Sequence, residues 1–240
     1  MTNQLKVQFY KLRKFPVFYL IAAGLSVLSI MYAIKTINVG TGWSGAYALL
    51  ASISDTSLMF APALLASYFI GVDFETRTIH NEIRIGYNRF SAILSRGFVT
   101  LSVSVLLYLL SYTIPITVIT SAINGFGTGI SVQEIAVKLI LFSFQMMAIQ
   151  SFTILFVFVS KKATLGMLIS VCFAFITCNL LRNLFGENNP VFALTSFYRI
   201  MMNNGNMTSA DILISFASAV TTLFIVFCIT YMAFQKAELK

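Results

Sequence analysis

Charge is scarce in this sequence. Only 10% of the 240 residues are Asp, Glu, Lys or Arg, whereas soluble globular domains carry roughly 25%. Hydrophobic residues make up 58% of the chain, and its mean hydropathy is +0.86. A soluble fold cannot bury this much apolar surface. The composition therefore excludes an ordinary soluble domain and indicates an integral membrane protein.

Catalytic and metal-binding side chains are also sparse. The sequence has one His, His80, and 3 Cys. The three Cys fall inside apolar runs. No group of these residues has the spacing of metal ligands, and no nucleophile stands beside a base. We therefore expect no catalytic residue, no metal site and no enzyme activity in this chain. The net charge of +8 is interpreted as a signal of membrane orientation, not of nucleic-acid binding.

Nucleotide-binding motifs are missing as well. A P-loop requires a Gly-Lys pair after a Gly-rich turn, and the sequence contains no Gly-Lys dipeptide. The glycine-rich stretch at 125–129 lacks the strand and helix of a dinucleotide site and is interpreted as a connector. This chain is therefore not expected to bind ATP or another cofactor by these routes.

Long apolar runs are what the sequence has in abundance. A transmembrane helix needs about 20 mainly apolar residues, and six candidate runs are 17–34, 47–72, 97–123, 135–159, 163–181 and 212–234. Pro62 and Pro115 interrupt the second and third runs and can kink them. The predicted fold class is all-α: a polytopic membrane protein with six transmembrane helices, in which residues 1–240 form a single transmembrane domain.

The basic residues predict the orientation of these spans. Of the 16 Lys and Arg residues, only Lys35, Lys138, Arg182 and Arg199 fall on one side of the predicted membrane. The positive-inside rule puts the other side in the cytoplasm, together with both termini and the loop after the second span.

Two further segments outside the spans are expected to be helical. In residues 2–15, Leu5, Phe9 and Leu12 share one helix face among basic side chains, which predicts an interfacial helix on the cytoplasmic leaflet. A disordered basic leader is the alternative. Residues 185–210 combine Asn189-Pro190 with apolar residues at helical spacing, which predicts a short helix at the outer interface or on the outer mouth of the bundle.

Asp55 is the one acidic residue inside a predicted span. Intramembrane carboxylates are costly and are functional candidates by default. Asp55 is expected a turn or two inside the outer end of its helix, where it can reach the headgroups or pair with Lys35 or Lys138. A structural and a functional role are both open, but one off-centre carboxylate argues against a self-powered transporter.

The segment 73–96 is the most polar part of the chain. It contains four Arg, two Glu, one Asp and His80 between two apolar spans. Ile79, Ile83 and Phe90 supply an apolar stripe, and Gly86 is expected to end the helix. The pattern predicts a short cytoplasmic helix that docks on a soluble partner, whereas the alternative is a solvated loop that only sets topology.

This chain resembles the permease subunits of bacterial type-2 ATP-binding-cassette (ABC) exporters. The residues that carry the resemblance are Asp73-Phe-Glu-Thr-Arg-Thr-Ile-His-Asn, Ile85-Gly-Tyr-Asn-Arg89 and Leu94-Ser-Arg96. The basic leader, the Phe234-Gln-Lys-Ala-Glu-Leu-Lys240 ending and the six-span layout also fit. The distinctive motif covers only about 25 residues, while the architecture covers the whole chain.

The resemblance implies a function and a set of partners. The segment 73–92 would be a coupling helix docked on a separate ABC ATPase subunit, which binds the ATP and Mg and hydrolyses the ATP. A second permease copy, the lipid of a bacterial plasma membrane and an amphipathic or antimicrobial peptide substrate, as in lantibiotic-immunity exporters, are the other implied partners. The implied docking residues are Phe74, Glu75, Arg77, Thr78, Asn81, Glu82, Arg84 and Arg89.

Two other functions remain open at this point. A stand-alone secondary transporter or channel for a small lipophilic substrate would use Asp55, and replacing Asp55 by Asn should then abolish transport. A membrane scaffold would bind its partner without changing that partner's ATP turnover.

Overall fold

The computed structural model describes residues 2–38, 43–55, 60–127, 130–176, 195–196, 199–200 and 207–236. Every regular element among them is helical, which confirms the all-α class. Most of the predicted outer segment at 185–210, including its Asn189-Pro190 cap, lies outside the described residues, as do residues 237–240.

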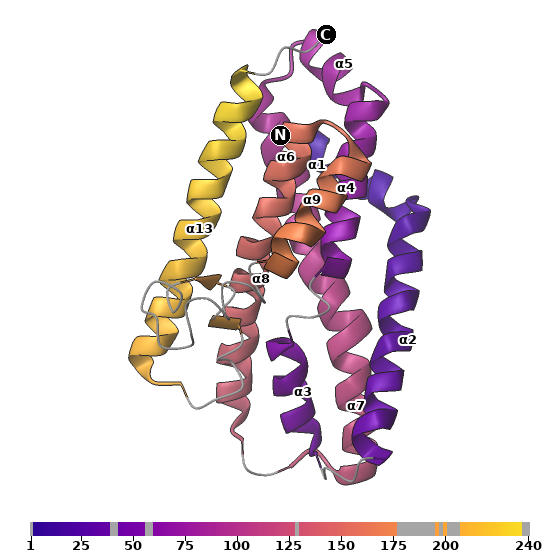
Figure 1. The fold of residues 1–240 in the computed structure, drawn as a ribbon, viewed down its shortest axis with the longest axis vertical. Coiled ribbons are helices and arrows are strands. Elements are labelled where there is room, and N and C mark those ends of the chain that lie inside the picture. Colours follow the sequence, from indigo (N-terminus) through magenta and orange to yellow (C-terminus); the bar gives the residue numbers. More distant parts are fainter. Residues whose placement is uncertain are drawn as a thin grey trace.

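Long helices form the bundle (Figure 1). They are α2 (Pro16–Asn38), α6 (Arg89–Tyr108) with its continuations η1 (Leu109–Thr113) and α7 (Ile114–Asn124), α8 (Val132–Ser160) and α13 (Ser209–Lys236). In the described part of the chain, 4 stretches are long and apolar enough to cross a membrane by length and composition: Pro16–Ile37, Arg89–Asn124, Val132–Ser160 and Ser209–Lys236. They coincide with four of the six predicted spans.

The other two predicted spans take a shorter form. The second is divided into α3 (Gly45–Ser54) and α4 (Phe60–Glu75), and the described part of the fifth is α9 (Ala163–Phe175). None of these three helices reaches the length of about 20 residues that a single crossing requires. The full count of six crossings therefore stays a prediction.

The division of the second span has local causes. Asp55 ends α3 with φ −78° and ψ 108°, an extended conformation that cannot continue the helix. Pro62 then lies in the first turn of α4, where its missing N–H costs no helical hydrogen bond. The predicted kink at Pro62 is thus a break in the helix that precedes it.

Pro115 produces a different irregularity in the third span. The five residues before Ile114 form the π-helix η1, and the N–H of Ile114 donates to the carbonyl of Leu109, five residues back. This wider turn lies just before Pro115, which has no N–H to donate to a helical hydrogen bond. The span continues through α6, η1 and α7 and is not broken.

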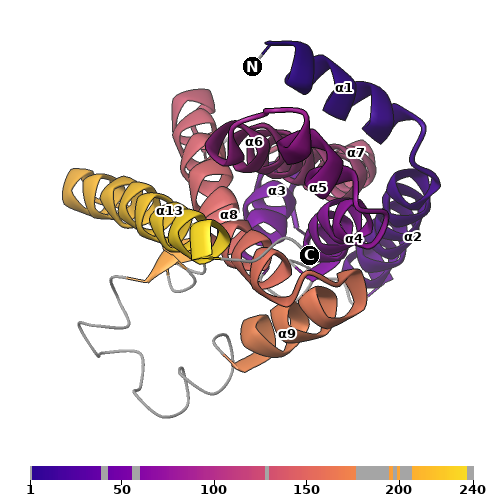
Figure 2. The ribbon, with the colours of Figure 1, turned by 90° about the horizontal axis from the view of Figure 1, so that it is seen from above.

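The short helix α5 (Thr78–Arg84) lies at one end of the bundle, together with α1 (Thr2–Arg13) and the end of α13 (Figure 1). We call this end the α5 end. In the view down the bundle, α1 lies crosswise to the helices seen end-on (Figure 2). The helix predicted in 2–15 is confirmed as α1, whereas its place at a membrane interface stays a prediction.

The predicted apolar stripe of α1 does not act as one face. Leu12 is buried and Leu5 packs against the same core, whereas Phe9 is 45% exposed beside the exposed Val7 and Tyr10. The buried face of α1 also carries Gln4 and Gln8. The helix therefore docks on the bundle through a mixed face and leaves Val7, Phe9 and Tyr10 outside.

Close packing between α4 and α9 depends on one glycine. A Cβ built at Gly71 would lie 2.3 Å from the Cα of Ala163, far inside a normal contact. The missing side chain brings the two backbones together, so that Glu75 Oε1 accepts a hydrogen bond of 2.9 Å from the N–H of Ala163 at the start of α9.

Candidate functional site

The α5 helix is a separate short element between two turns. Arg77, at its N-cap, has φ 55° in the left-handed region, and Gly86, just beyond its end, has φ 101°. Asn88 then caps α6, because its side chain accepts a hydrogen bond from the N–H of Phe90 at 3.0 Å. The predicted short helix and the predicted glycine break are both confirmed.

Arg96 joins this short helix to two spans. Its guanidinium is buried and makes two parallel bonds of 2.9 Å to the carboxylate of Glu82 on α5. Its Nε donates to Asp73 on α4 at 2.8 Å. Paired arginine–carboxylate bonds of this kind are strong and strictly oriented. Arg96 on α6 therefore fixes α5 and the end of α4 to one another.

The network extends to α1. Lys11 forms an ion pair with Asp73, which is buried, and its ammonium lies 4.6 Å from the centre of the Phe69 ring. Nearer the start of α1, Gln4 accepts a hydrogen bond from Ser91 on α6. We call Lys11, Asp73, Glu82 and Arg96 the charge cluster.

Some of the residues expected to dock a partner point into the molecule. Phe74 is 4% exposed, and its ring lies edge-on to Phe158 at 5.2 Å and to Phe234 at 6.1 Å. Arg89 donates to the carbonyls of Phe234 and Gln235 at 3.0 and 2.8 Å, at the C-terminal end of α13. The interpretation of Phe74 as a surface residue is therefore wrong for this fold, because its ring belongs to the core.

Other expected docking residues do face outward. Arg77, Thr78, Asn81 and Arg84 are exposed, as is Glu75, whose carboxylate also bonds α9. Glu82 is half-buried and bonds Arg96 at the far end of the same polar segment. The structure thus divides the expected set into an outward face and inward anchors.

Sequence reasoning missed two exposed apolar residues beside this face. Ile85 is 79% exposed and Tyr87 is 48% exposed, on either side of Gly86. The signal that could have found them is their position in a glycine turn, where no periodic pattern buries them. Together with Arg77, Thr78, Asn81 and Arg84 they form what we call the α5 face.

His80 lies behind the α5 face. Its Nδ1 is buried without a hydrogen-bond partner, and its ring lies 6.4 Å from that of Phe74. Desolvation, and then the positive charges of Lys161 and Arg77, lower the pKa of His80 below its usual value. The Nδ1 of His80 is thus neither solvated nor hydrogen-bonded.

Asp55 lies deeper than expected. The 10 residues of α3 separate it from the outer end of that helix, a rise of about 15 Å, or half the thickness of a hydrocarbon core. Figure 1 shows α3 ending beside the middle part of the long helices. Asp55 therefore lies about three turns inside the outer end of its helix, roughly one turn further in than predicted, because α3 ends only there.

Two tyrosines bind the end of α3. Tyr108 is buried, and its hydroxyl donates to the carbonyls of Ser52 at 3.0 Å and Asp55 at 3.1 Å. Tyr112 donates to Asp55 Oδ2 at 3.1 Å. Both belong to the region of η1, where the π-turn changes the angle between successive residues. The polar cluster of Asp55, Tyr108 and Tyr112 is therefore a joint between the two irregular spans.

The expected partner Lys138 is not at this cluster. Its ammonium pairs with Glu134 on the same helix at 2.7 Å. Lys35, the other candidate, is an exposed residue in the last turn of α2. Asp55 instead accepts hydrogen bonds from Tyr112 at its carboxylate and from Tyr108 at its backbone carbonyl. Nothing in the sequence predicted that these tyrosines would lie opposite it.

Metal ligands do not gather in the described residues: no group of three or more His, Cys, Asp or Glu side chains could hold an ion there. No protein-family model matches this chain, and no curated protein matches it significantly.

Proposed function

We propose that this chain is the membrane permease subunit of an ATP-driven exporter, worked by a separate soluble ATPase that docks on the α5 face. The observation that carries the proposal is the direct connection between that face and the spans. Asn81 and Arg84 are exposed on the same short helix whose Glu82 is bonded to the buried Arg96. The resemblance of segment 73–96 to permeases of type-2 ABC exporters supports the same conclusion.

The charge cluster provides a path for force. A push on α5 reaches α6 through the Glu82–Arg96 pair and α4 through Asp73. Arg96 is fully buried and Glu82 is half-buried, so breaking the pair leaves a buried guanidinium without this partner and is costly. Arg89 carries the same motion to the end of α13. Docking on α5 therefore acts on three helices at once.

The orientation follows from the distribution of charge. Lys6, Lys11 and Arg13 belong to α1, Lys14 directly follows that helix, and Lys236 ends α13, so these five cations belong to the elements at the α5 end. By the positive-inside rule this end faces the cytoplasm, where an ATPase is available. Six crossings, with α3 and α4 sharing the second, keep both termini on that side.

The resemblance supplies the remaining parts. A second copy of this chain completes the transport path, and the ATPase holds ATP and Mg. The substrate class is an amphipathic or antimicrobial peptide, which suits the apolar surfaces of a bilayer-embedded path.

The proposal is tested by charge reversal on the α5 face. A candidate ABC ATPase from the same organism is co-expressed with this chain, and the complex is purified and assayed for ATP turnover. Arg84→Glu should lower co-purification of the ATPase at least tenfold, since a like or unpaired charge at an interface costs several kcal/mol. Arg13→Glu is the matched control, because Arg13 is an exposed cation at the same end but outside the α5 face. Equal losses in the two variants, or none in either, would count against docking on α5.

Asp55 favours a second candidate function, a stand-alone secondary transporter for a small lipophilic substrate. Secondary transporters place discontinuous helices and ionisable groups near the bilayer midplane, and the α3–α4 break with Asp55 has this form. The decisive measurement is transport by the purified chain in liposomes under a proton gradient without any ATPase. Uptake that Asp55→Asn abolishes would establish this function and exclude the ATP-driven one.

A further inference from the structure

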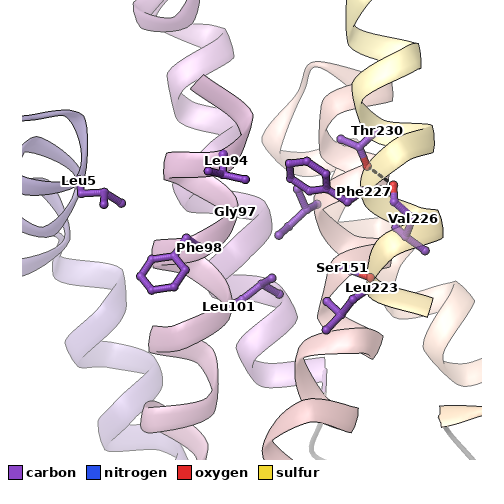
Figure 3. A pocket seen from close by; sticks show the side chains of 11 residues that line it. Leu5, Leu94, Gly97, Phe98, Leu101, Ser151, Leu223, Val226, Phe227 and Thr230 are labelled. Carbon is purple, nitrogen blue, oxygen red and sulfur yellow. Dashed lines mark hydrogen bonds between the residues drawn. The ribbon is translucent and has the colours of Figure 1, made fainter. Parts of the chain in front are cut away.

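A groove of about 350 Å³ opens between α6 and α13. Figure 3 shows Leu94, Phe98 and Leu101 along α6, with Leu223 and Phe227 facing them from α13. Ser151 on α8 lies at the back of the groove, and Leu5 of α1 lies beside it at the α5 end. The volume is in the range of sites that hold a small ligand.

The groove exists because α6 and α13 meet only near one end. There the ring of Phe90 lies edge-on to Phe227 at 5.9 Å and to Tyr231 at 5.6 Å. Further along, Gly97 has no side chain to fill the space. A Cβ at Gly97 would meet only Ile154 Cδ1, at 3.9 Å.

The lining offers nothing to a polar ligand. Its two hydroxyl groups are already used, since Ser151 donates to the carbonyl of Ala148 at 2.6 Å and Thr230 to that of Val226 at 2.8 Å. The other side chains that line it are apolar. The groove therefore favours an apolar ligand such as a hydrocarbon chain. Phe98 is 56% exposed and lies on the open side of the groove, which would face the bilayer.

The charges around the α5 end of the groove are positive. Lys6 follows Leu5 on α1, a helix without any acidic residue. Arg89 lies at the start of α6, little more than one turn before Leu94. Among the acidic residues at this end, Asp73 and Glu82 are paired with Lys11 and Arg96, and Glu75 accepts a hydrogen bond from the start of α9. A molecule with its tail in the groove would thus have its head beside cations.

We propose that the groove binds an acyl chain of an anionic phospholipid from the leaflet at the α5 end. The tail fills the space left by Gly97, and the phosphate-bearing head lies against the basic rim. Each basic residue near a membrane surface contributes roughly 1 kcal/mol to the attraction of anionic lipid. The bound lipid occupies the space into which α13 would otherwise close on α6. The inference does not depend on the energy source for transport.

The test is photolabelling of the whole chain in vesicles. Phosphatidylglycerol with a diazirine in its acyl chain is compared with phosphatidylcholine that carries the same probe, and labelled peptides are mapped by mass spectrometry. We expect labelling of the α6 and α13 peptides that contain Phe98 and Phe227, with a preference for the anionic lipid. Lys6→Gln should lower that preference about fivefold.

Gly97→Leu fills the groove and displaces about two methylene groups, so labelling there should fall about tenfold. Gly24→Leu is the matched control, because a Cβ at Gly24 meets nothing within 4 Å and the residue is exposed on α2. If Gly97→Leu does not fold, as judged by circular dichroism, Ser151→Leu fills the groove from α8.

Three results would overturn the proposal. Equal labelling by the two lipids would remove the role of the basic rim. Labelling that the groove-filling variants leave unchanged would show that the lipid lies elsewhere. Crosslinks between Phe98 or Phe227 and a second copy of the chain would show that protein, and not lipid, covers the groove.

Discussion

The charge cluster at the α5 end and the polar cluster at Asp55 hold helices together by different means. Arg96 is saturated by two carboxylates from two other helices, and Lys11 adds a second cation. The carboxylate of Asp55 accepts a hydrogen bond from the phenol of Tyr112, and Tyr108 donates to backbone carbonyls at the end of α3. The charge cluster pairs opposite charges, whereas the polar cluster supplies hydrogen-bond donors to carbonyl groups at the end of α3.

The difference bears on how each region can move. Separating α5 from α6 leaves charges unpaired in a buried site, which is costly. Separating α3 from η1 breaks hydrogen bonds that are individually weaker in a membrane, about 0.6 kcal/mol on average. We therefore expect the α5 end to move as a rigid unit and the middle of the bundle to be the place where helices shift. The predictions below test this contrast from the largest effect to the smallest.

Arg96→Gln should have the largest effect. It leaves Asp73 and Glu82 without their buried partner, and breaking such a pair costs about 3–5 kcal/mol. Thermal unfolding in detergent, followed by circular dichroism, measures the loss. Arg84→Gln on the exposed face should change stability by no more than about 0.5 kcal/mol. Similar values for the two variants would mean that the charge cluster does not stabilise the α5 end.

Gly71→Ala should come next. The added methyl would lie 2.3 Å from the backbone of Ala163, so α4 and α9 must separate at a cost of about 1–3 kcal/mol. Gly97→Ala is the control, since its methyl has room. An unchanged melting temperature for Gly71→Ala would contradict the close contact.

Tyr108→Phe should cost about 1 kcal/mol, because it leaves the carbonyls of Ser52 and Asp55 without this donor. The same unfolding assay applies, and Tyr112→Phe, which removes one bond to the carboxylate, is the comparison. A loss as large as that of Arg96→Gln would erase the contrast between the two clusters.

The pH dependence at His80 should be the smallest effect. The pKa of His80 is lowered in the folded chain, so the unfolded state binds the proton more readily. Stability should therefore fall as the pH drops through the unfolded value of about 6.5 and level off below the folded pKa. His80→Asn should flatten the difference between melting temperatures at about pH 7.5 and about pH 5.5. An identical slope in the variant would assign the pH dependence to other groups.

Composition was enough to predict much of the fold. Apolar runs predicted the helical class and the positions of four stretches that are long and apolar enough to cross a membrane, because bilayer thickness fixes the length of such a run. The polar segment 73–96 and Gly86 predicted the short helix α5, because charge cannot enter the bilayer and glycine readily ends a helix. The candidate residues Arg77, Thr78, Asn81 and Arg84 are exposed, whereas their docking on a partner stays a prediction.

The tertiary structure alone decided which residues meet. Arg96 lies 23 positions after Asp73 and 14 after Glu82. No helical periodicity in the sequence indicates that these three residues meet. Phe74 turned inward because a core of Phe158 and Phe234 formed beside it. The depth of Asp55 depended on where α3 ended, and its tyrosine partners came from another span. Hydropathy is a property of each stretch by itself, whereas pairing is a property of stretches that fold against one another.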